Sequence, residues 1–271
     1  MTITQTVSNS IATAYLHDDG SVRTEGNPKW GGDSSAVQHL LKDITKLFST
    51  DSAFAALKAD GSVISWGDPD CGGNSSAVQH CLTNVSAITA TASAFAALKA
   101  DGTVVTWGHP NLGGDSSPIQ HLLTNVTTIF ANCYAFAALK TDSTVITWGR
   151  PDCGGNSSAV KHLLINVKTI SASLPAFAAL KADGSVISWG EDYWGGDSNA
   201  IRHLLTDVTT IVSNNGAFAV LKADGTVVTW GHPEYGGDSS AVQEKLINIQ
   251  IIKTKRCGLI AIKADGTRIS W

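Results

Sequence analysis

The chain has 271 residues and a net charge of −4, with 43% hydrophobic and only 15% charged residues. The hydrophobic share suffices for a core, and the charged share lies below the average of about 25%. Neither a cluster of Lys and Arg nor an apolar run approaching ~20 residues occurs, so we expect no nucleic-acid partner and no membrane span. The N-terminus lacks a basic segment followed by an apolar stretch, so we expect a cytoplasmic protein.

One aspartate of a recurrent turn returns at a strict spacing of 41 residues. It stands at Asp19, Asp60, Asp101, Asp142, Asp183, Asp224 and Asp265, without insertion or deletion between copies. A fixed period of this length predicts tandem structural repeats. No linker, low-complexity segment or break in composition divides the sequence. We therefore expect one domain over residues 1–271.

The first repeat comprises a predicted strand at residues 2–8 and a hairpin at residues 11–26. It departs from the other repeats at four positions, where Tyr15, His17, Arg23 and Glu25 replace an Ala, a Lys, an apolar residue and a Trp. A Glu beside an Arg and a His could form a functional pocket. The same departures fit a degenerate terminal repeat whose weaker packing the fold tolerates, and we favour this second interpretation.

The later repeats share, with a few substitutions, a strand of the form V-x-x-I, the run A-F-A-A-L-K, an Asp-Gly turn and a run ending in Trp-Gly. Two β-prone runs around Asp-Gly predict a hairpin with a tight turn, because Gly accepts positive φ and Asp tolerates it. A large Trp at a regular position predicts packing in the core between repeats. These residues are Trp66, Trp107, Trp148, Trp189, Trp230 and Trp271.

A Gly pair and the segment S-S-A-V-Q-H-L-L, or a close variant, follow the hairpin. The Gly pair predicts a bend with unusual backbone angles. In the third repeat the apolar residues after the bend recur at helical spacing, which predicts one short helix per repeat. Ser116 or Ser117 is suited to cap this helix, and Pro118 lies in its first turn, where proline is tolerated.

The last residues, 248–271, predict a final strand and hairpin, which completes seven three-strand sets with six helices between them. Such small sheets either close into a ring or remain an open solenoid, and open arrays carry polar terminal caps. Because the last hairpin is nearly as apolar as the middle ones, we predict an all-β fold with short helices, a seven-bladed β-propeller. We expect a monomer whose ring is closed by contact between residues 1–26 and 248–271.

The pattern V-x-x-I, A-L-K-x-D-G-x-V-x-x-W-G and G-G resembles the repeat of the regulator of chromosome condensation family, over nearly the whole chain. The resemblance implies a seven-bladed propeller. That family includes a nucleotide-exchange factor for a small GTPase, ubiquitin-ligase domains and many bacterial proteins. The repeat here is shorter than the family's usual one, and Ala94, Ala135 and Ala176 stand where the family has His. The exchange-factor activity is not implied, because residues specific to it cannot be placed on this chain.

No arrangement of residues typical of catalysis or metal binding stands out. The recurrent Ser, His and Asp follow from the period, and equivalent His residues in different blades would point apart around a ring. The five cysteines form no C-x-x-C pair and no disulfide pattern, so we interpret them as free thiols. We expect no metal and no cofactor, and we favour a non-enzymatic protein; an enzyme would need a site built from His17, Arg23 and Glu25.

The segment after each Trp-Gly varies most between repeats, and it contains our candidate binding residues. Positions that every repeat shares are required by the fold, so variable positions are free to serve recognition. Aromatic residues beside polar groups suit protein or sugar contacts. We hypothesise a non-enzymatic propeller that binds a protein or other macromolecular partner through these loops. A multivalent glycan-binding propeller with sites between adjacent blades, and neutral drift of a surface loop, remain open. The candidates are Trp30, His109, Arg150, Tyr193, Trp194, His232 and Tyr235.

Overall fold

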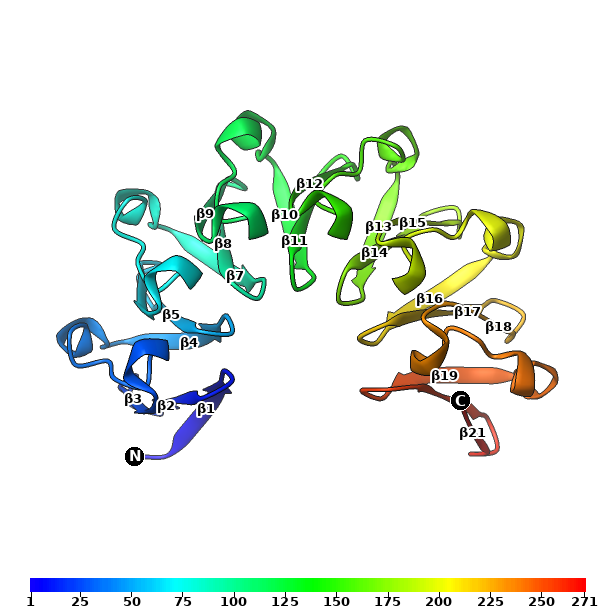
Figure 1. Ribbon diagram of the computed structural model, residues 1–271, viewed down its shortest axis with the longest axis horizontal. Helices are drawn as coiled ribbons and strands as arrows, with labels where there is room; N and C mark the ends of the chain where they lie inside the picture. Colours follow the sequence, from blue (N-terminus) through cyan, green and yellow to red (C-terminus); the bar gives the residue numbers. More distant parts are fainter. The chain divides into compact units, whose positions relative to one another are not determined.

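The computed structural model describes residues 1–271 and contains β-strands and short 3-10 helices as its only regular elements. The strands form seven three-stranded sheets, each built from three strands that follow one another in the chain (Figure 1). This repeated all-β arrangement confirms the predicted seven sets of three strands. None of the helices has the length and apolarity that a membrane crossing requires.

The elements follow the 41-residue period throughout. The strands are β1 (Ile3–Ser8), β2 (Ala12–His17) and β3 (Val22–Gly26); β4 (Ile44–Ser49), β5 (Ala53–Lys58) and β6 (Val63–Gly67); β7 (Val85–Ala90), β8 (Ala94–Lys99) and β9 (Val104–Gly108); β10 (Val126–Ala131), β11 (Ala135–Lys140) and β12 (Val145–Gly149); β13 (Val167–Ala172), β14 (Ala176–Lys181) and β15 (Val186–Gly190); β16 (Val208–Ser213), β17 (Ala217–Lys222) and β18 (Val227–Gly231); and β19 (Ile249–Thr254), β20 (Leu259–Lys263) and β21 (Arg268–Ser270). The 3-10 helices between sheets are η1 (Pro28–Trp30) and η2 (Gln38–Leu40); η3 (Pro69–Cys71) and η4 (Gln79–Cys81); η5 (Pro110–Leu112) and η6 (Ser117–Leu122); η7 (Pro151–Cys153) and η8 (Lys161–Leu163); η9 (Asp192–Trp194) and η10 (Asn199–Leu204); and η11 (Pro233–Tyr235) and η12 (Ser240–Lys245).

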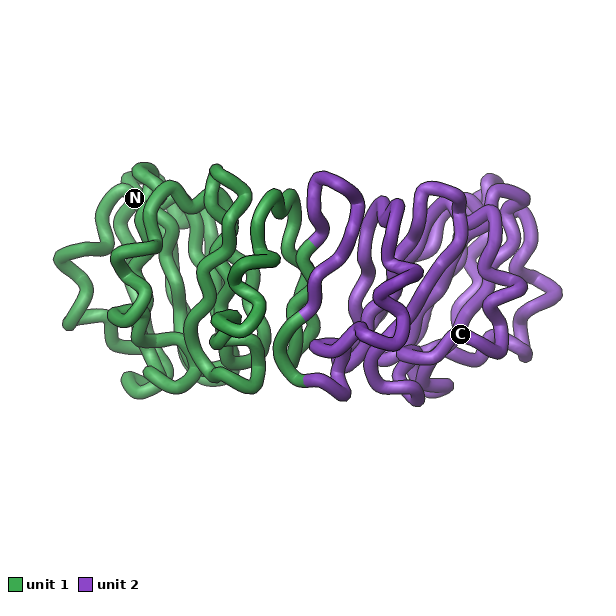
Figure 2. The backbone as a smooth tube through the Cα atoms, turned by 90° about the horizontal axis from the view of Figure 1, so that it is seen from above, with its two compact units in different colours: residues 1–138, 148–150 green, residues 139–147, 151–271 purple.

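By its internal contacts the chain forms two compact units (Figure 2). Unit 1 comprises residues 1–138 and 148–150, and unit 2 comprises residues 139–147 and 151–271. Unit 1 contains the first three sheets whole, and unit 2 contains the last three whole.

The second sheet shows how the repeat sequence produces its hairpin. β5 and β6 pair antiparallel, with Phe54 opposite Trp66. In the turn between them, the carboxylate of Asp60 accepts hydrogen bonds from the backbone N–H and the hydroxyl of Ser62, at 2.9 and 2.6 Å. These bonds lower the pKa of the Asp60 carboxyl, with the hydroxyl bond as the largest cause. The Asp therefore stabilises the turn through its charged form.

The glycine of this turn is required for two reasons. Gly61 has a φ of 78°, in the left-handed region that favours glycine. A Cβ at this position would also lie 3.0 Å from the Cα of Asn84, in the next repeat. The Gly61 carbonyl accepts the backbone N–H of Val85 at 2.9 Å, which joins the turn to that repeat. In the fourth repeat, Ser143 occupies the same position with a φ of 62°.

The Trp that ends each hairpin packs between repeats, as predicted. Trp66 is 4% exposed, its ring stacks on Phe54 with 5.5 Å between centroids, and its Nε1 donates to the carbonyl of Gly31 at 3.0 Å. Gly31 follows the preceding sheet, so this one side chain joins two repeats. A Cβ on Gly31 would come within 2.6 Å of the Phe54 ring. The equivalent Trp residues donate at 2.9–3.1 Å to Gly72, Gly113, Gly154, Gly195 and Gly236.

The hydrophobic core lies between successive sheets. In one buried cluster, Ala55, Leu57 and Val63 of the second repeat pack with Phe95 and Trp107 of the third. The small alanine allows the two sheets to approach closely, and the aromatic pair fills the remaining space. Each sheet therefore depends on its neighbour in the chain for burial.

The segment after the Gly pair forms one short helix per repeat, as predicted, and this helix is of the 3-10 type, η6 in the third repeat. A second 3-10 helix, η5 in the third repeat, precedes the Gly pair. Segments this short cannot nucleate a stable α-helix. The predicted serine cap is wrong: Ser116 makes no side-chain cap bond, and the carboxylate of Asp115 accepts the N–H of Ser117 at 2.9 Å instead. The buried hydroxyl of Ser116 faces the sheet, where it accepts a hydrogen bond from Thr106 at 2.9 Å and donates one to Gln120 at 3.0 Å.

Candidate functional site

The variable segments after Trp-Gly lie against the turns that join the first and second strands of each sheet. In five repeats a side chain in such a turn donates a hydrogen bond to the carbonyl of the last residue of a 3-10 helix, at 2.7–3.2 Å. The pairs are Asn9 with Trp30, Thr50 with Cys71, Thr91 with Leu112, Ser173 with Trp194, and Asn214 with Tyr235. These turns and 3-10 helices therefore share one edge of each sheet, which we call the turn surface.

Backbone hydrogen bonds also join the turns of neighbouring repeats within each unit. In unit 1 the N–H of Asp51 donates to the carbonyl of Ala92, and the N–H of Ala92 donates to the carbonyl of Cys133, both at 2.9 Å. In unit 2 the N–H of Leu174 donates to the carbonyl of Asn215 at 2.9 Å. Within each unit, these neighbouring turns therefore lie side by side, and with them the variable loops that they hold.

Four of the seven candidate residues come together in unit 2. Tyr193 and Trp194 belong to η9, Tyr235 belongs to η11, and His232 immediately precedes η11. The His232 ring is central, with centroid distances of 4.7, 4.8 and 5.2 Å to the other three rings in chain order. The centroids of Trp194 and Tyr235 are 5.5 Å apart. We call these four residues the aromatic cluster.

A glycine that the sequence did not single out makes room for this cluster. A Cβ on Gly216 would lie 2.6 Å from the ring of Tyr235 and 3.0 Å from Cε3 of Trp194. Gly216 shows no left-handed φ, so the requirement for glycine here is one of space. The equivalent positions of the second and third repeats are Ser52 and Ser93. The position varies in the other repeats (Ile11, Tyr134, Pro175 and Cys257), so the glycine gave no distinct sequence signal for the cluster.

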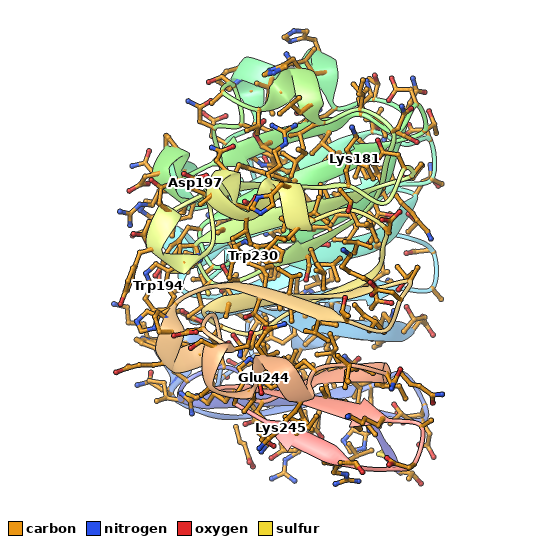
Figure 3. All side chains as sticks on the ribbon, turned by 90° about the vertical axis from the view of Figure 1, so that its right-hand side faces the viewer. Lys181, Trp194, Asp197, Trp230, Glu244 and Lys245 are labelled. Atoms are coloured by element: carbon orange, nitrogen blue, oxygen red, sulfur yellow. The ribbon has the colours of Figure 1, made fainter.

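The cluster lies at the molecular surface, and a hydrogen bond within its own loop holds the central ring. Tyr193 is 59% exposed, whereas the other three members are half-buried. Figure 3 shows Trp194 at one edge of unit 2 and Lys181, at the end of β14, toward the opposite edge. The Nδ1 of His232 accepts the backbone N–H of Glu234 at 3.2 Å, so this nitrogen is unprotonated and the imidazole is fixed to its own loop. The rings therefore form a preorganised surface rather than a set of free side chains.

The remaining loop candidates belong to unit 1 and do not form a second cluster. Trp30 and His109 lie in different repeats, and the buried Nδ1 of His109 has no hydrogen-bond partner. The guanidinium of Arg150 lies 5.5 Å from the ring centroid of Tyr134, a cation–π contact within the turn surface. The structure thus joins Tyr193, Trp194, His232 and Tyr235 into one site and leaves the other three apart.

Three of the four departures in the first repeat form an exposed polar group on β2 and β3. Tyr15 donates a hydrogen bond to the carboxylate of Glu25, and Arg23 lies 3.9 Å from the same carboxylate. The bond to Glu25 raises the pKa of the Tyr15 hydroxyl, because ionised tyrosine could not donate it. His17 does not join them, and its buried Nδ1 has no partner. With side-chain exposures of 73% for Arg23 and 52% for Glu25, this is an open polar face rather than an enclosed site.

Unit 2 also contains a cavity of about 270 Å³ between the fourth and fifth repeats. Its lining includes Trp189 of β15 and the polar side chains of Asn156, Asp197, Asn199 and Arg202. No group of three or more His, Cys, Asp or Glu in the chain is arranged to hold a metal ion. None of the five cysteines forms a disulfide, as the sequence predicts.

Several solved structures resemble the chain over most of its length. The structure of Prp20p from Saccharomyces cerevisiae has a TM-score of 0.54 and 16% sequence identity, and the match covers 86% of this chain and 72% of that one. Yeast RCC1 (Prp20), in its complex with Kap60, has a TM-score of 0.51 and 15% identity, covering 96% and 79%. The ectodomain of the receptor kinase CR4 from Physcomitrella patens has a TM-score of 0.50 and 14% identity, covering 98% and 72%.

The seven three-stranded sheets agree with these matches. The chain has an RCC1-like, seven-bladed β-propeller fold. Identities of 14–16% show the fold alone, because folds of this kind serve many functions. No protein-family model matches the sequence, and no curated protein matches it.

Proposed function

We propose that this protein is a non-enzymatic β-propeller that binds a protein or another macromolecular partner through its turn surface, with the aromatic cluster at the contact. The observation that carries the proposal is the convergence of rings from two repeats in one cluster. Other repeats form the same 3-10 helices with Asp, Asn, Cys or Leu at the equivalent positions, so the fold does not require the rings. Tyr and Trp are the residue types that carry most binding energy at protein interfaces.

Relatives in fold support protein binding as the general role. Prp20p is described by its binding to Gsp1p and histones, and yeast RCC1 by its complex with Kap60. We further infer that the repeats are a short form of the regulator of chromosome condensation repeat. We expect the protein to act as a cytoplasmic monomer without metal or cofactor.

A capture experiment with repeat-matched substitutions tests the proposal. Leu112 holds the position equivalent to both Trp194 and Tyr235, so the double variant Trp194→Leu/Tyr235→Leu removes two rings without introducing a residue foreign to that turn. The control is Cys71→Leu, which introduces the same leucine at the equivalent position of the second repeat, in a turn without aromatic residues. Immobilised wild type and control should retain the same proteins from a lysate of the source organism. The double variant should retain at least tenfold less of them.

Thermal unfolding separates lost binding from lost folding. The double variant should melt within about 4 °C of wild type, which corresponds to roughly 1 kcal/mol for a chain of this size. Equal retention by wild type and the double variant would show that the cluster is not the contact.

The cavity between the fourth and fifth repeats favours glycan binding as a second candidate function. Amide, carboxylate and guanidinium groups such as those of Asn156, Asp197 and Arg202 are the hydrogen-bonding groups that sugars use. A glycan array should then give signals that Arg202→Gln abolishes, since Gln stands at this position in four other repeats. A blank array would exclude the candidate.

A further inference from the structure

The two loops that carry the aromatic cluster also contain three carboxylate residues within two residues of its rings in sequence. Glu191 and Asp192 immediately precede Tyr193, and Glu234 lies between His232 and Tyr235 in sequence. Asp192 and Glu234 are exposed. Glu191 makes no side-chain cap bond to its 3-10 helix, whereas the equivalent residues of the first two loops do. Neither loop, 191–197 or 232–238, contains a Lys or an Arg. The rings therefore lie in a locally negative surface.

The most exposed ring of the cluster is not covered by a stacked neighbour. Tyr193 meets Trp194 at an interplanar angle of 89° and His232 at 64°, so both contacts are edge-type. With 59% of the residue exposed, the ring is accessible while its position is fixed. An aromatic ring of this kind attracts a cation placed within about 6 Å of its centroid, and neighbouring carboxylates add to the attraction.

We propose that the aromatic cluster binds a basic segment of a partner protein, with a Lys or Arg side chain seated on Tyr193 between the carboxylates of Glu191, Asp192 and Glu234. This inference rests on the proposed function, because it names the chemistry of the partner that the same surface binds. Charge complementarity decides between occupants: an acidic segment would be repelled by three carboxylates that have no ion-pair partner in the structure.

A pair of cations marks one boundary of the proposed site. Lys255 and Arg256 are exposed in the turn of the last sheet, next to the cluster on the side of Tyr235. This proximity follows from Asn214, whose side-chain amide donates both to the carbonyl of Tyr235 at 2.7 Å and to the carbonyl of Gly258 at 3.0 Å. A bound basic segment should therefore avoid this side, lie over η9 and extend away from Tyr235. Removing the two cations should tighten its binding.

The test measures the binding of a fluorescently labelled octa-arginine peptide by anisotropy, with octa-glutamate as the opposite probe. The third repeat has Asn111 at the position of both Tyr193 and Glu234, so Tyr193→Asn and Glu234→Asn are repeat-matched. Tyr193→Asn should weaken octa-arginine binding about threefold to fivefold, the worth of an exposed cation–π contact. Glu234→Asn should weaken it and reduce its salt dependence.

Two matched variants control for net charge. Asp70→Asn removes the same charge from the equivalent turn of the second repeat and should change octa-arginine binding by less than twofold. The sixth repeat has Asn214 at the position of Lys255, so Lys255→Asn is also repeat-matched. This variant should strengthen octa-arginine binding. Binding that Asp70→Asn weakens as much as Glu234→Asn does would be non-specific attraction to an acidic protein and would overturn the proposal. So would octa-glutamate binding more tightly than octa-arginine.

The lysate capture of the same variants separates failure of this inference from failure of the proposed function. If Tyr193→Asn abolishes capture but leaves octa-arginine binding unchanged, a partner binds at the cluster and its basic character is wrong. If Tyr193→Asn changes neither measurement and Trp194→Leu/Tyr235→Leu also retains capture, both proposals are wrong.

Discussion

At the residue scale, one turn of the fourth repeat has a less favourable backbone conformation than the same turn in the other repeats. Ser143 adopts a φ of 62°, at a turn position where Gly61, Gly102, Gly184 and Gly225 have 78°. The left-handed region costs a residue with a Cβ roughly 1 kcal/mol relative to glycine. Ser143→Gly should therefore raise the unfolding free energy by about 1 kcal/mol and the melting temperature by about 2–4 °C.

The reverse exchange in a neighbouring repeat is the matched control for that prediction. Gly102→Ser places serine in the same turn and should lower the melting temperature by a similar or larger amount, because a Cβ there would lie 3.2 Å from the Cα of Asn125. Urea unfolding of the two variants and wild type measures the changes in unfolding free energy, and thermal unfolding measures the changes in melting temperature. A Ser143→Gly protein no more stable than wild type would mean that the serine side chain compensates for its backbone.

A second residue-scale prediction concerns the space beneath the aromatic cluster. Gly216→Ser introduces the residue found at the equivalent position in the second and third repeats, but here its Cβ would overlap the rings of Tyr235 and Trp194. Overpacking of this kind costs about 1–3 kcal/mol. In the Trp194→Leu/Tyr235→Leu background the cost should fall below about 0.5 kcal/mol, because the overlapping rings are absent. A double-mutant cycle by urea unfolding measures the difference, and an equal cost in both backgrounds would contradict it.

At the element scale, the hairpins could be predicted from the sequence, and the connecting segments only in part: their short helices were expected, but the bonds that hold them were not. The Asp-Gly turn and the alternating apolar runs act locally, so Asp60, Gly61 and Trp66 have the roles predicted for them. The segment S-S-A-V-Q-H-L-L has helical spacing, yet its buried Ser75 accepts a hydrogen bond from Ser65 of the adjacent strand, and Gln79 donates to the carbonyl of Val63 of the same strand. Local periodicity carries no information about contacts to another element, which is why a serine cap was predicted there.

The aromatic cluster shows the same division between local and non-local information. The variability of the loops identified its members, but the sequence did not distinguish Tyr193 and His232 from Trp30 and His109. Their meeting depends on the approach of loops 41 residues apart and on the space above Gly216. Candidate residues could therefore be named in advance, and their grouping could not.

The Gln of the connecting segment gives a prediction at this scale. Gln120 donates through Nε2 to the carbonyl of Val104 at 2.8 Å and accepts a hydrogen bond from Ser116 at 3.0 Å, which fastens η6 to β9. Gln120→Ala should cost about 1–2 kcal/mol, since each hydrogen bond contributes about 0.5–1.5 kcal/mol. The equivalent residue of the fourth repeat is the exposed Lys161, and Lys161→Ala should change stability by less than about 0.5 kcal/mol. Similar melting temperatures for the two variants would refute the role given to Gln120.

At the scale of the whole molecule, closure of the ring is the remaining prediction; within each unit, neighbouring repeats bury one another's core residues. Between the second and third repeats, Val63 and Trp107 belong to the same buried cluster. The last and first repeats have Arg268 and Glu25 at the positions equivalent to these two. The two residues carry opposite charges, so a contact between residues 248–271 and 1–26 would bring an ion pair to the place that an apolar pair holds elsewhere. Glu25 already contacts Tyr15 and Arg23 in its own sheet, so closure stays a prediction for a distance measurement to test.

The distance between equivalent turns of adjacent repeats is the reference against which this closure can be tested. Spin labels on cysteines at Asp60 and Asp101, in the Asp-Gly turns of adjacent repeats, give by pulsed electron resonance the distance between neighbours. In a closed ring of equal repeats the first and last turns are also neighbours, so labels at Asp19 and Asp265 should give the same distance within about 5 Å, an allowance for the motion of the labels on exposed turns. Charge reversal gives a second readout: Glu25→Arg should destabilise the protein and Glu25→Arg/Arg268→Glu should restore it, by about 0.2–1 kcal/mol for a partly exposed pair. A much longer distance between Asp19 and Asp265, with no recovery in the double reversal, would show an open array whose first and last sheets do not meet.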